Sequence, residues 1–441
     1  MLGALLGAAP ATRAQTVGTI ELGTLGGSWS DATALNDSGQ VVGTSAISSD
    51  AEQHAFSWTQ AGGMVDLGVP VGGVGSFARD VNANGQIVGG TTAPSGFCKI
   101  AVSWTEAAGS VLIYNDCSHG LAVNGSGQVM GFKYGWMSPA AFLWTEAGFI
   151  WGEDSYVPAA VNESGQVVGT RSCYRGCPAR ALLSTLAGGT IDLGTLGGSY
   201  AKAGSVNNGG QVVGSSAMAG DAQEHAFLWT PADGMMDLGT LGGTRSAALA
   251  VSDNGQVVGW STTAGDAVQH AFSWTREGGM RDLTPDATWA QAYAVNDGGQ
   301  VVGSSTADPT RGSGYRYFSW KQWKQADRTI DLGLSGAWGP NELRPSSLNG
   351  NGQVVGKTDS GRAFLWTPID VVKATYSQGS LRVEVASVLG PASALEVSGY
   401  GAMTWKANQT RWTFNYTLQT PPGRITVCGV EACASAPVLA E

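Results

Sequence analysis

One eight-residue pattern recurs along most of this chain and constrains its fold more than any other feature. The pattern is Asn-x-x-Gly-Gln-Val-Val-Gly, with Ser252 replacing the Asn in one copy and Ile87 or Met130 replacing a Val in two others. The glutamines of successive copies lie 38 to 53 residues apart, at Gln40, Gln86, Gln128, Gln166, Gln211, Gln256, Gln300 and Gln353. A period of about 45 residues is typical of propeller blades rather than of short solenoid coils.

Each unit predicts four short strands. They are a run of small residues ending in Val-Asn, then Gln-Val-Val-Gly, then His-Ala-Phe-x-Trp-Thr, then Gly-Met-x-Asp-Leu-Gly, as at 292–296, 300–303, 225–230 and 234–239. The Asn-x-x-Gly segment supplies residues that tolerate positive φ, which suits a tight hairpin. The Val-Val and Phe-x-Trp segments are too short for helices and suit buried strands. We therefore expect an all-β fold with four antiparallel strands per blade.

A tryptophan recurs on the third expected strand in every unit except the fourth. One blade cannot bury both faces of its sheet, so an aromatic side chain placed once per unit is expected to fill the seam with the next blade. The seven residues are Trp58, Trp104, Trp144, Trp229, Trp274, Trp320 and Trp366.

The two ends of the repeat predict how the ring closes. No Asp-Leu-Gly strand follows Trp366, whereas Glu21-Leu22-Gly23 precedes the first unit. If this N-terminal strand pairs with the last unit, a β-propeller of about eight four-stranded blades closes without a free sheet edge. An open ring, or seven blades with one unit set aside, is the alternative, because the third and fourth units are the most degenerate.

The segments outside the repeat predict a small domain and an export signal. Alternating runs such as Leu381–Val385 and Trp412–Thr417 suggest a small C-terminal β-sandwich. The apolar segment Met1–Pro10 is too short to span a bilayer and runs into Ala11–Gln15, which resembles the end of a secretory signal. We therefore expect a secreted or periplasmic protein divided into residues 1–14 (signal segment), 15–370 (propeller) and 371–441 (accessory β-sandwich).

The net charge excludes some classes of binding partner, and the cysteine content predicts disulfides. The chain has 24 Lys and Arg against 34 Asp and Glu, a net charge of −10, which argues against nucleic acid and anionic membranes as partners. We expect a monomer without a membrane span and with no cofactor. The six cysteines form three local pairs that suit disulfides in an exported protein, Cys98/Cys117, Cys173/Cys177 and Cys428/Cys433.

Three motifs together carry a family resemblance. They are Asp-Leu-Gly-Thr-Leu-Gly-Gly at 192–198 and 237–243, the Asn-x-x-Gly-Gln-Val-Val-Gly anchor, and His-Ala-Phe-x-Trp at 54–58, 225–229 and 270–274. Over about residues 19–368 the chain resembles the bacterial HAF-repeat family of extracellular proteins. The resemblance implies secretion and a repeated β-architecture, and it assigns no activity to particular residues.

Two groups of residues could suggest metal binding. A shared metal would require the His-Ala-Phe histidines to converge, but equivalent positions on different blades lie far apart, so we expect His54, His225 and His270 in seams or on the surface. Calcium needs several converging oxygens, and hairpin formation alone accounts for the acids in the Asn-x-x-Gly turns. These acids are Asp37, Glu163, Asp253 and Asp297. No metal site is predicted.

Function is expected where equivalent positions diverge at one end of the ring, as loops on rigid scaffolds do. The entrance to the first strand of each unit diverges most, mixing aromatic, charged and amide side chains that suit a glycan or protein site. Neutral drift of exposed loops would produce the same diversity. The predicted ligand-binding residues are Trp29, Asp31, Phe77, His119, Tyr200, Lys202, Arg245, Trp289, Gln291, Glu342 and Arg344.

Three functions remain open. The absence of a catalytic motif favours an exported binding protein that presents this rim to a glycan or an extracellular protein. A secreted polysaccharide hydrolase or lyase is the second, with Asp31 and Glu342 as carboxylates and Arg245 or Arg344 orienting an anionic substrate. A structural envelope protein without a small ligand is the third.

Overall fold

The chain forms two compact units, one spanning Ile20–Trp366 and the other containing the strands from β33 onward. The structure is a computed structural model. It describes residues 19–440 except for 115, 135–138, 155, 172–176, 186–188, 307–314, 323–326, 337–345, 359, 368, 378–379, 388–395, 398–400, 407–410, 418–423, 429–432 and 438. No helix in these described ranges has the length and apolar character needed to cross a membrane.

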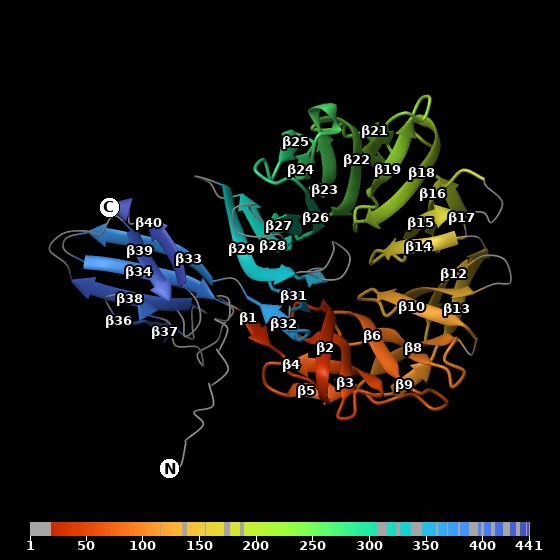
Figure 1. The fold of residues 1–441 in the computed structure, drawn as a ribbon, viewed down its shortest axis with the longest axis horizontal. Helices are drawn as coiled ribbons and strands as arrows, with labels where there is room; N and C mark the ends of the chain where they lie inside the picture. The colour runs from red at the N-terminus through yellow and green to blue at the C-terminus, as the bar shows by residue number, and fades with distance from the viewer. Residues whose placement is uncertain are drawn as a thin grey trace, which may run out of the picture. The chain divides into compact units, whose positions relative to one another are not determined.

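The repeats build a β-propeller-like ring of antiparallel sheets (Figure 1). Within the described residues of this unit there are six four-stranded sheets and one eight-stranded sheet, which comprises β18 to β25. The inner strands are β2 (Gly26–Leu35), β6 (Ser76–Val81), β10 (Ser118–Val123), β14 (Tyr156–Val161), β18 (Gly197–Val206), β22 (Gly242–Val251), β26 (Ala290–Val295) and β30 (Ser347–Leu348). The second strands are β3 (Val41–Ile47), β7 (Ile87–Thr92), β11 (Val129–Tyr134), β15 (Val167–Arg171), β19 (Val212–Met218), β23 (Val257–Thr263), β27 (Gln300–Thr306) and β31 (Val354–Lys357).

The two outer positions of each sheet hold the His-Ala-Phe and Asp-Leu-Gly segments. The third strands are β4 (Gln53–Thr59), β8 (Lys99–Thr105), β12 (Pro139–Thr145), β16 (Arg180–Thr185), β20 (Glu224–Thr230), β24 (Gln269–Thr275), β28 (Tyr315–Gln322) and β32 (Ala363–Trp366). The outermost strands are β5 (Gly63–Asp66), β9 (Gly109–Leu112), β13 (Gly148–Asp154), β17 (Gly189–Asp192), β21 (Gly234–Asp237), β25 (Gly279–Asp282), β29 (Asp327–Gly336) and β1 (Thr19–Glu21). A single 3-10 turn, η1 (Ala264–Asp266), is the one helical element among the described residues.

The N-terminal strand closes the ring in the way that the sequence predicts. Strand β1 is hydrogen-bonded next to β32, more than 300 residues later, as the red and blue strands in Figure 1 show. The Leu22 N–H donates to the Ala363 carbonyl oxygen (2.9 Å), and the Ala363 N–H donates to the Ser30 hydroxyl (2.8 Å). Leu22 also packs in one apolar cluster with Trp58 and Leu365.

The recurring tryptophans fill the seams between sheets, as expected. All seven are buried. Trp104 of β8, for example, packs in one cluster with Val42 and Ala55 of the preceding sheet. Because each cluster draws on two successive repeats, apolar burial holds neighbouring repeats together around the ring.

The C-terminal unit contains two antiparallel sheets built from short strands. Five strands lie in the order β37-β38-β34-β33-β41, in which β41 runs parallel to β33, and four lie in the order β36-β35-β39-β40. The bounds are β33 (Ile369–Ser377), β34 (Ser380–Ser387), β35 (Glu396–Val397), β36 (Gly401–Ala402), β37 (Thr404–Lys406), β38 (Arg411–Thr417), β39 (Arg424–Cys428), β40 (Cys433–Pro437) and β41 (Leu439–Ala440).

Candidate ligand-binding rim and central cavity

A β-bulge fixes the position of each candidate residue near the start of an inner strand. In β2 the register shifts between Ala32 and Ala34, and Asp31, just before the bulge, faces Thr44 of β3. The same arrangement places Phe77 opposite Gly90, His119 opposite Phe132, Lys202 opposite Ser215, and Gln291 opposite Ser304. Five predicted residues therefore share one register position, at the end of the ring where the inner strands begin: Asp31, Phe77, His119, Lys202 and Gln291. Trp29, Tyr200 and Arg245 lie two residues before this position on β2, β18 and β22.

Four aromatic rings from β6, β10 and β11 contact one another in a cluster, which we call the aromatic platform (Phe77, His119, Phe132 and Tyr134). His119 stacks on Phe132 with ring centroids 4.9 Å apart and planes 9° from parallel. Tyr134 meets both rings edge-on at 5.6 and 5.3 Å, and Phe77 lies 6.4 Å from His119. The platform thus spans the seam between two sheets.

Two cations border the aromatic platform. The Lys99 ammonium lies 4.8 Å from the centre of the Phe77 ring, and the Arg79 guanidinium lies 5.6 Å from it. Burial lowers the pKa of His119 to about 4, and the charges of Lys99 and Arg79 contribute to the shift. His119 is therefore a neutral ring at pH 7.

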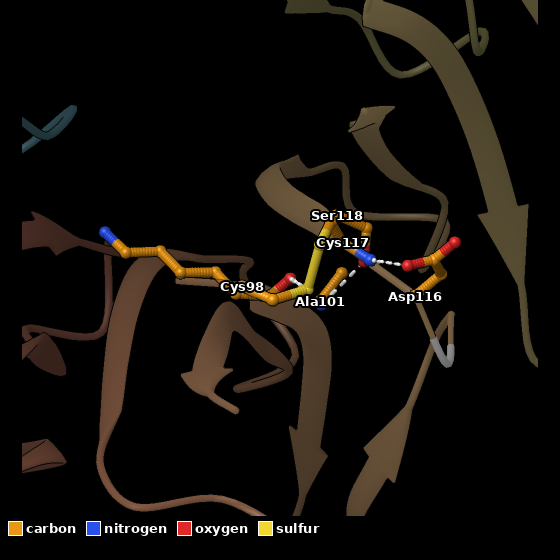
Figure 2. The surroundings of a disulfide bond; sticks show 6 residues. Cys98, Ala101, Asp116, Cys117 and Ser118 are labelled. Atoms are coloured by element: carbon orange, nitrogen blue, oxygen red, sulfur yellow. Dashed lines mark hydrogen bonds between the residues drawn. A yellow bond between two sulfur atoms is a disulfide. The ribbon is translucent and has the colours of Figure 1, made fainter. Parts of the chain in front are cut away.

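A disulfide joins the two segments that lead into this surface. Cys98 directly precedes Lys99, Cys117 lies two residues before His119, and their sulfur atoms are bonded to each other (Figure 2). The Ala101 N–H donates to the Ser118 hydroxyl across the same seam (2.9 Å). One of the three predicted pairs is thereby confirmed, whereas Cys173 of the second lies outside the described residues. In the third pair, Cys428 and Cys433 are register partners in β39 and β40.

A second cluster gathers three predicted residues around one buried carboxylate. Glu224, at the start of β20, accepts a hydrogen bond from the Ser215 hydroxyl (2.8 Å) and forms an ion pair with Arg245 (3.1 Å). The Arg245 guanidinium also lies 6.0 Å from the Trp260 ring.

Tyr200 and Lys202 belong to the same cluster. The Lys202 ammonium lies 5.9 Å from the Tyr200 ring, and burial together with the charge of Glu224 raises the pKa of the Tyr200 hydroxyl. Glu224 therefore interacts with Arg245 and Tyr200, and Lys202 joins the cluster through the Tyr200 ring.

A third cluster lies at the closure of the ring. The Lys357 ammonium, on β31, lies 5.2 Å from the Trp29 ring on β2. Burial raises the pKa of the Asp31 carboxyl, and the charge of Lys357 opposes this effect.

Of the four remaining predicted residues, two lie within the described part of the chain and two lie outside it. Trp289 directly precedes β26, and its backbone N–H donates to the Thr306 hydroxyl (3.1 Å). Gln291 lies on β26 itself. Glu342 and Arg344 lie outside the described residues, as does the pairing of Glu342 with Asp31.

The His-Ala-Phe histidines pair with the aspartates of the Asp-Leu-Gly segments. The Nδ1 atoms of His54, His225 and His270 lie 2.7 to 3.0 Å from the carboxylate twelve residues later in the same sheet. In the fourth repeat Arg180 takes this role and pairs with Asp192 (3.0 Å). The pairs link the third strand to the outermost one, so each histidine pairs within its own repeat.

One grouping among the described residues has the composition of a metal site, Cys98, Asp116 and Cys117. Its two sulfur atoms are bonded to each other and therefore do not offer thiolate ligands. The Asp116 carboxylate accepts the Cys117 N–H (2.7 Å).

The Asn-x-x-Gly turns meet at the opposite end of the inner strands, around a cavity of about 440 Å³. The anchor side chains form a belt in which Asn36 donates through Nδ2 to the Asn82 carbonyl oxygen (2.9 Å) and each later Asn repeats this contact. Asn349 closes the belt on the Asn36 carbonyl oxygen (3.0 Å).

The four acids of these turns also line the cavity. Each accepts a backbone N–H from the preceding turn: Asp37 from Gly350 (2.8 Å), Glu163 from Gly125 (2.8 Å), Asp253 from Asn208 (2.9 Å) and Asp297 from Asp253 (2.8 Å). These carboxylates therefore serve to hold neighbouring turns together.

Sequence reasoning missed several residues at the rim because it compared only the inner strands. Phe132, Trp260 and Lys357 occupy the position after the glycine on the second strand, and Lys99 and Glu224 begin the third. Both positions vary between repeats, so the same internal comparison applied to these strands could have found them.

A ring of antiparallel sheets around a central cavity defines a protein of the β-propeller class. No family model matches the chain, and no curated protein matches it. Among solved structures, TolB from Acinetobacter baumannii is similar at 11% identity with a TM-score of 0.35, over 71% of this chain and 75% of that one. Acylaminoacyl peptidase from Pyrococcus horikoshii is similar at 8% identity with a TM-score of 0.42, over 83% of this chain. The match spans 59% of the peptidase.

Proposed function

We propose that this chain is an exported binding protein of the HAF-repeat type that recognises a glycan or an extracellular protein at the end of the ring where its inner strands begin. The observation that carries the proposal is the presence of aromatic and charged side chains from three seams at this one end. Flat apolar rings combined with a few oriented polar groups are typical of ligand sites. At the opposite end, the anchor amides and the acidic side chains that line the cavity are engaged in hydrogen bonds between the turns.

The architecture that we propose for this function has eight blades. The eight-stranded sheet joins two four-stranded units through one parallel bridge, Glu224 to Arg245, so we count it as two blades. The two sheets of the C-terminal unit would form the accessory β-sandwich. Residues 1–14 would direct export, and the Cys98–Cys117 disulfide suits an oxidising compartment.

A binding screen tests the function. Protein starting at Gln15 is applied to arrayed glycans and polysaccharides, and the same wells are assayed for reducing ends or unsaturated products. We expect binding without product, and weaker binding by the Trp29→Ala and Trp289→Ala variants. Ile191→Ala, an exposed residue on the outer strand β17, is the control. Unchanged affinity in both tryptophan variants would contradict the proposal that the rim binds the ligand. Release of product would favour the alternative function, a polysaccharide-cleaving enzyme that uses Asp31.

A further inference from the structure

The rim clusters differ in how their cations are compensated. Arg245 forms an ion pair with the buried Glu224, and Lys357 interacts with the Asp31 carboxylate. Within the part of the chain that the structure describes, no carboxylate pairs with Lys99 or Arg79, although both side chains are exposed. In a chain of net charge −10, two neighbouring unpaired cations are an arrangement that a bound anion would compensate.

The side chains beside these cations are aromatic and neutral. His119 and Phe132 stack with nearly parallel planes, and His119 and Phe77 are buried. Tyr134, with 57% of its surface exposed, extends the aromatic platform toward solvent. Phe97, directly before Cys98, is 99% exposed in the loop that leads to Lys99. Aromatic faces of this kind pack against the apolar face of a pyranose ring.

The backbone around the aromatic platform is held rigidly. The Cys98–Cys117 disulfide joins the two segments, and the Tyr134 N–H donates to the Cys117 carbonyl oxygen (2.9 Å). Phe77 covers Gly90, where an added Cβ would come within 2.6 Å of the ring. A site whose side chains are held in place by such contacts loses little entropy when it binds a ligand.

We propose that the aromatic platform together with Lys99 and Arg79 is a subsite for a carboxylated sugar, such as a uronic acid unit of an acidic polysaccharide. The inference rests on the proposed function and names its ligand class. The sugar ring stacks on the exposed Tyr134 ring of the platform, and its carboxylate accepts hydrogen bonds from the ammonium and the guanidinium. An acidic peptide would satisfy the two cations and leave the stacked rings without a partner, so the observations favour the sugar.

Three polymers distinguish recognition of the sugar ring from recognition of the carboxylate. Polygalacturonate offers both, its fully methyl-esterified form offers the rings without the charge, and polyglutamate offers the charge without the rings. We expect clear binding of polygalacturonate only, weakening as salt is added because the ion pairs are screened. Equal affinity for the ester would overturn the role of the cations, and equal affinity for polyglutamate would overturn the role of the rings.

Single variants locate the subsite. We expect Lys99→Gln and Arg79→Gln each to weaken polygalacturonate binding by about tenfold, the loss typical of one charge-assisted hydrogen bond. Tyr134→Ala should also weaken it, whereas Arg276→Gln, which removes the same charge from another sheet, should not. All four side chains are exposed, so thermal unfolding should be unchanged. Wild-type affinity in both cation variants would overturn the inference.

Failure of this inference can be told apart from failure of the proposed function. Neutral glycan binding that is lost in Trp29→Ala but unchanged in Lys99→Gln would leave the rim as a binding site and overturn only the acidic subsite. Silence toward every arrayed glycan would contradict glycan recognition as a whole and the subsite with it.

Discussion

The glycine that ends each Val-Val-Gly segment lies beneath a carbonyl group of the inner strand. The bulge brings the carbonyl oxygen of the rim residue so close that an added Cβ would lie 1.9 Å from the Lys202 oxygen at Gly214 and 2.0 Å from the Asp31 oxygen at Gly43. The glycine is therefore required by the same backbone geometry that sets the rim residues in place.

Replacing this glycine should destabilise the protein. We expect Gly214→Ala to lower the free energy of unfolding by about 1 to 3 kcal/mol, the usual cost of forcing atoms into a packed site. Gly189→Ala is the control, because nothing lies within 4 Å of a Cβ at that position on β17. Urea denaturation measures both, and equal stability of the two variants would refute the steric argument.

A single acidic residue on β6 should give the fold a pH dependence. Burial raises the pKa of the Asp80 carboxyl from 3.8 to about 6, although the Val123 and Val81 N–H groups donate to it. Between these two values the folded protein retains a proton that the unfolded chain has released, so stability falls as pH rises. Asp80→Asn should flatten this part of the stability curve, measured by thermal unfolding from pH 4 to 7. A curve parallel to that of the wild type would contradict the shift.

At the scale of an element, each Asn-x-x-Gly turn performs two tasks. The anchor Oδ1 accepts the N–H of the glutamine four residues later, as in Asn349 with Gln353 (2.9 Å), and Nδ2 reaches the next turn. Ser252 retains the first contact, with Gln256 (3.2 Å), but among the described turns its short hydroxyl forms no hydrogen bond to the next anchor. The contact between anchors is therefore absent at this one described position of the belt.

This difference predicts a pair of opposite effects. Asn349→Ser should keep the turn and lose the bond that closes the belt, lowering the free energy of unfolding by about 0.5 to 1.5 kcal/mol. Ser252→Asn should supply the absent donor to Asn296 and raise stability by a similar amount. Urea denaturation of both variants checks this, and changes of the same sign would contradict the belt.

At the scale of the whole molecule, stability depends on a short strand far from its partner in sequence. Ile20 and Leu22 join the apolar cluster that holds the first and last repeats together. Deleting residues 1–22 should expose the edge of β32 and lower the temperature of unfolding, with concentration-dependent association through the free edge. A chain starting at Gln15 is the control and should behave as the full chain does. Equal unfolding temperatures would show that closure does not need β1.

The repeated strands, the positive-φ turns and the tryptophan seams could be predicted from the sequence, because periodicity and local backbone preference are encoded within each unit. The pairing of the N-terminal strand could also be predicted, because the last repeat lacks its outermost strand. Which side chains meet across a seam depends on the tertiary structure. Lys99 reaches Phe77, Glu224 reaches Arg245 and Lys357 reaches Trp29 because neighbouring repeats bring together residues 22, 21 and 328 positions apart. The first two contacts depend on the packing of adjacent repeats, and the third depends on closure of the ring, rather than on any local pattern.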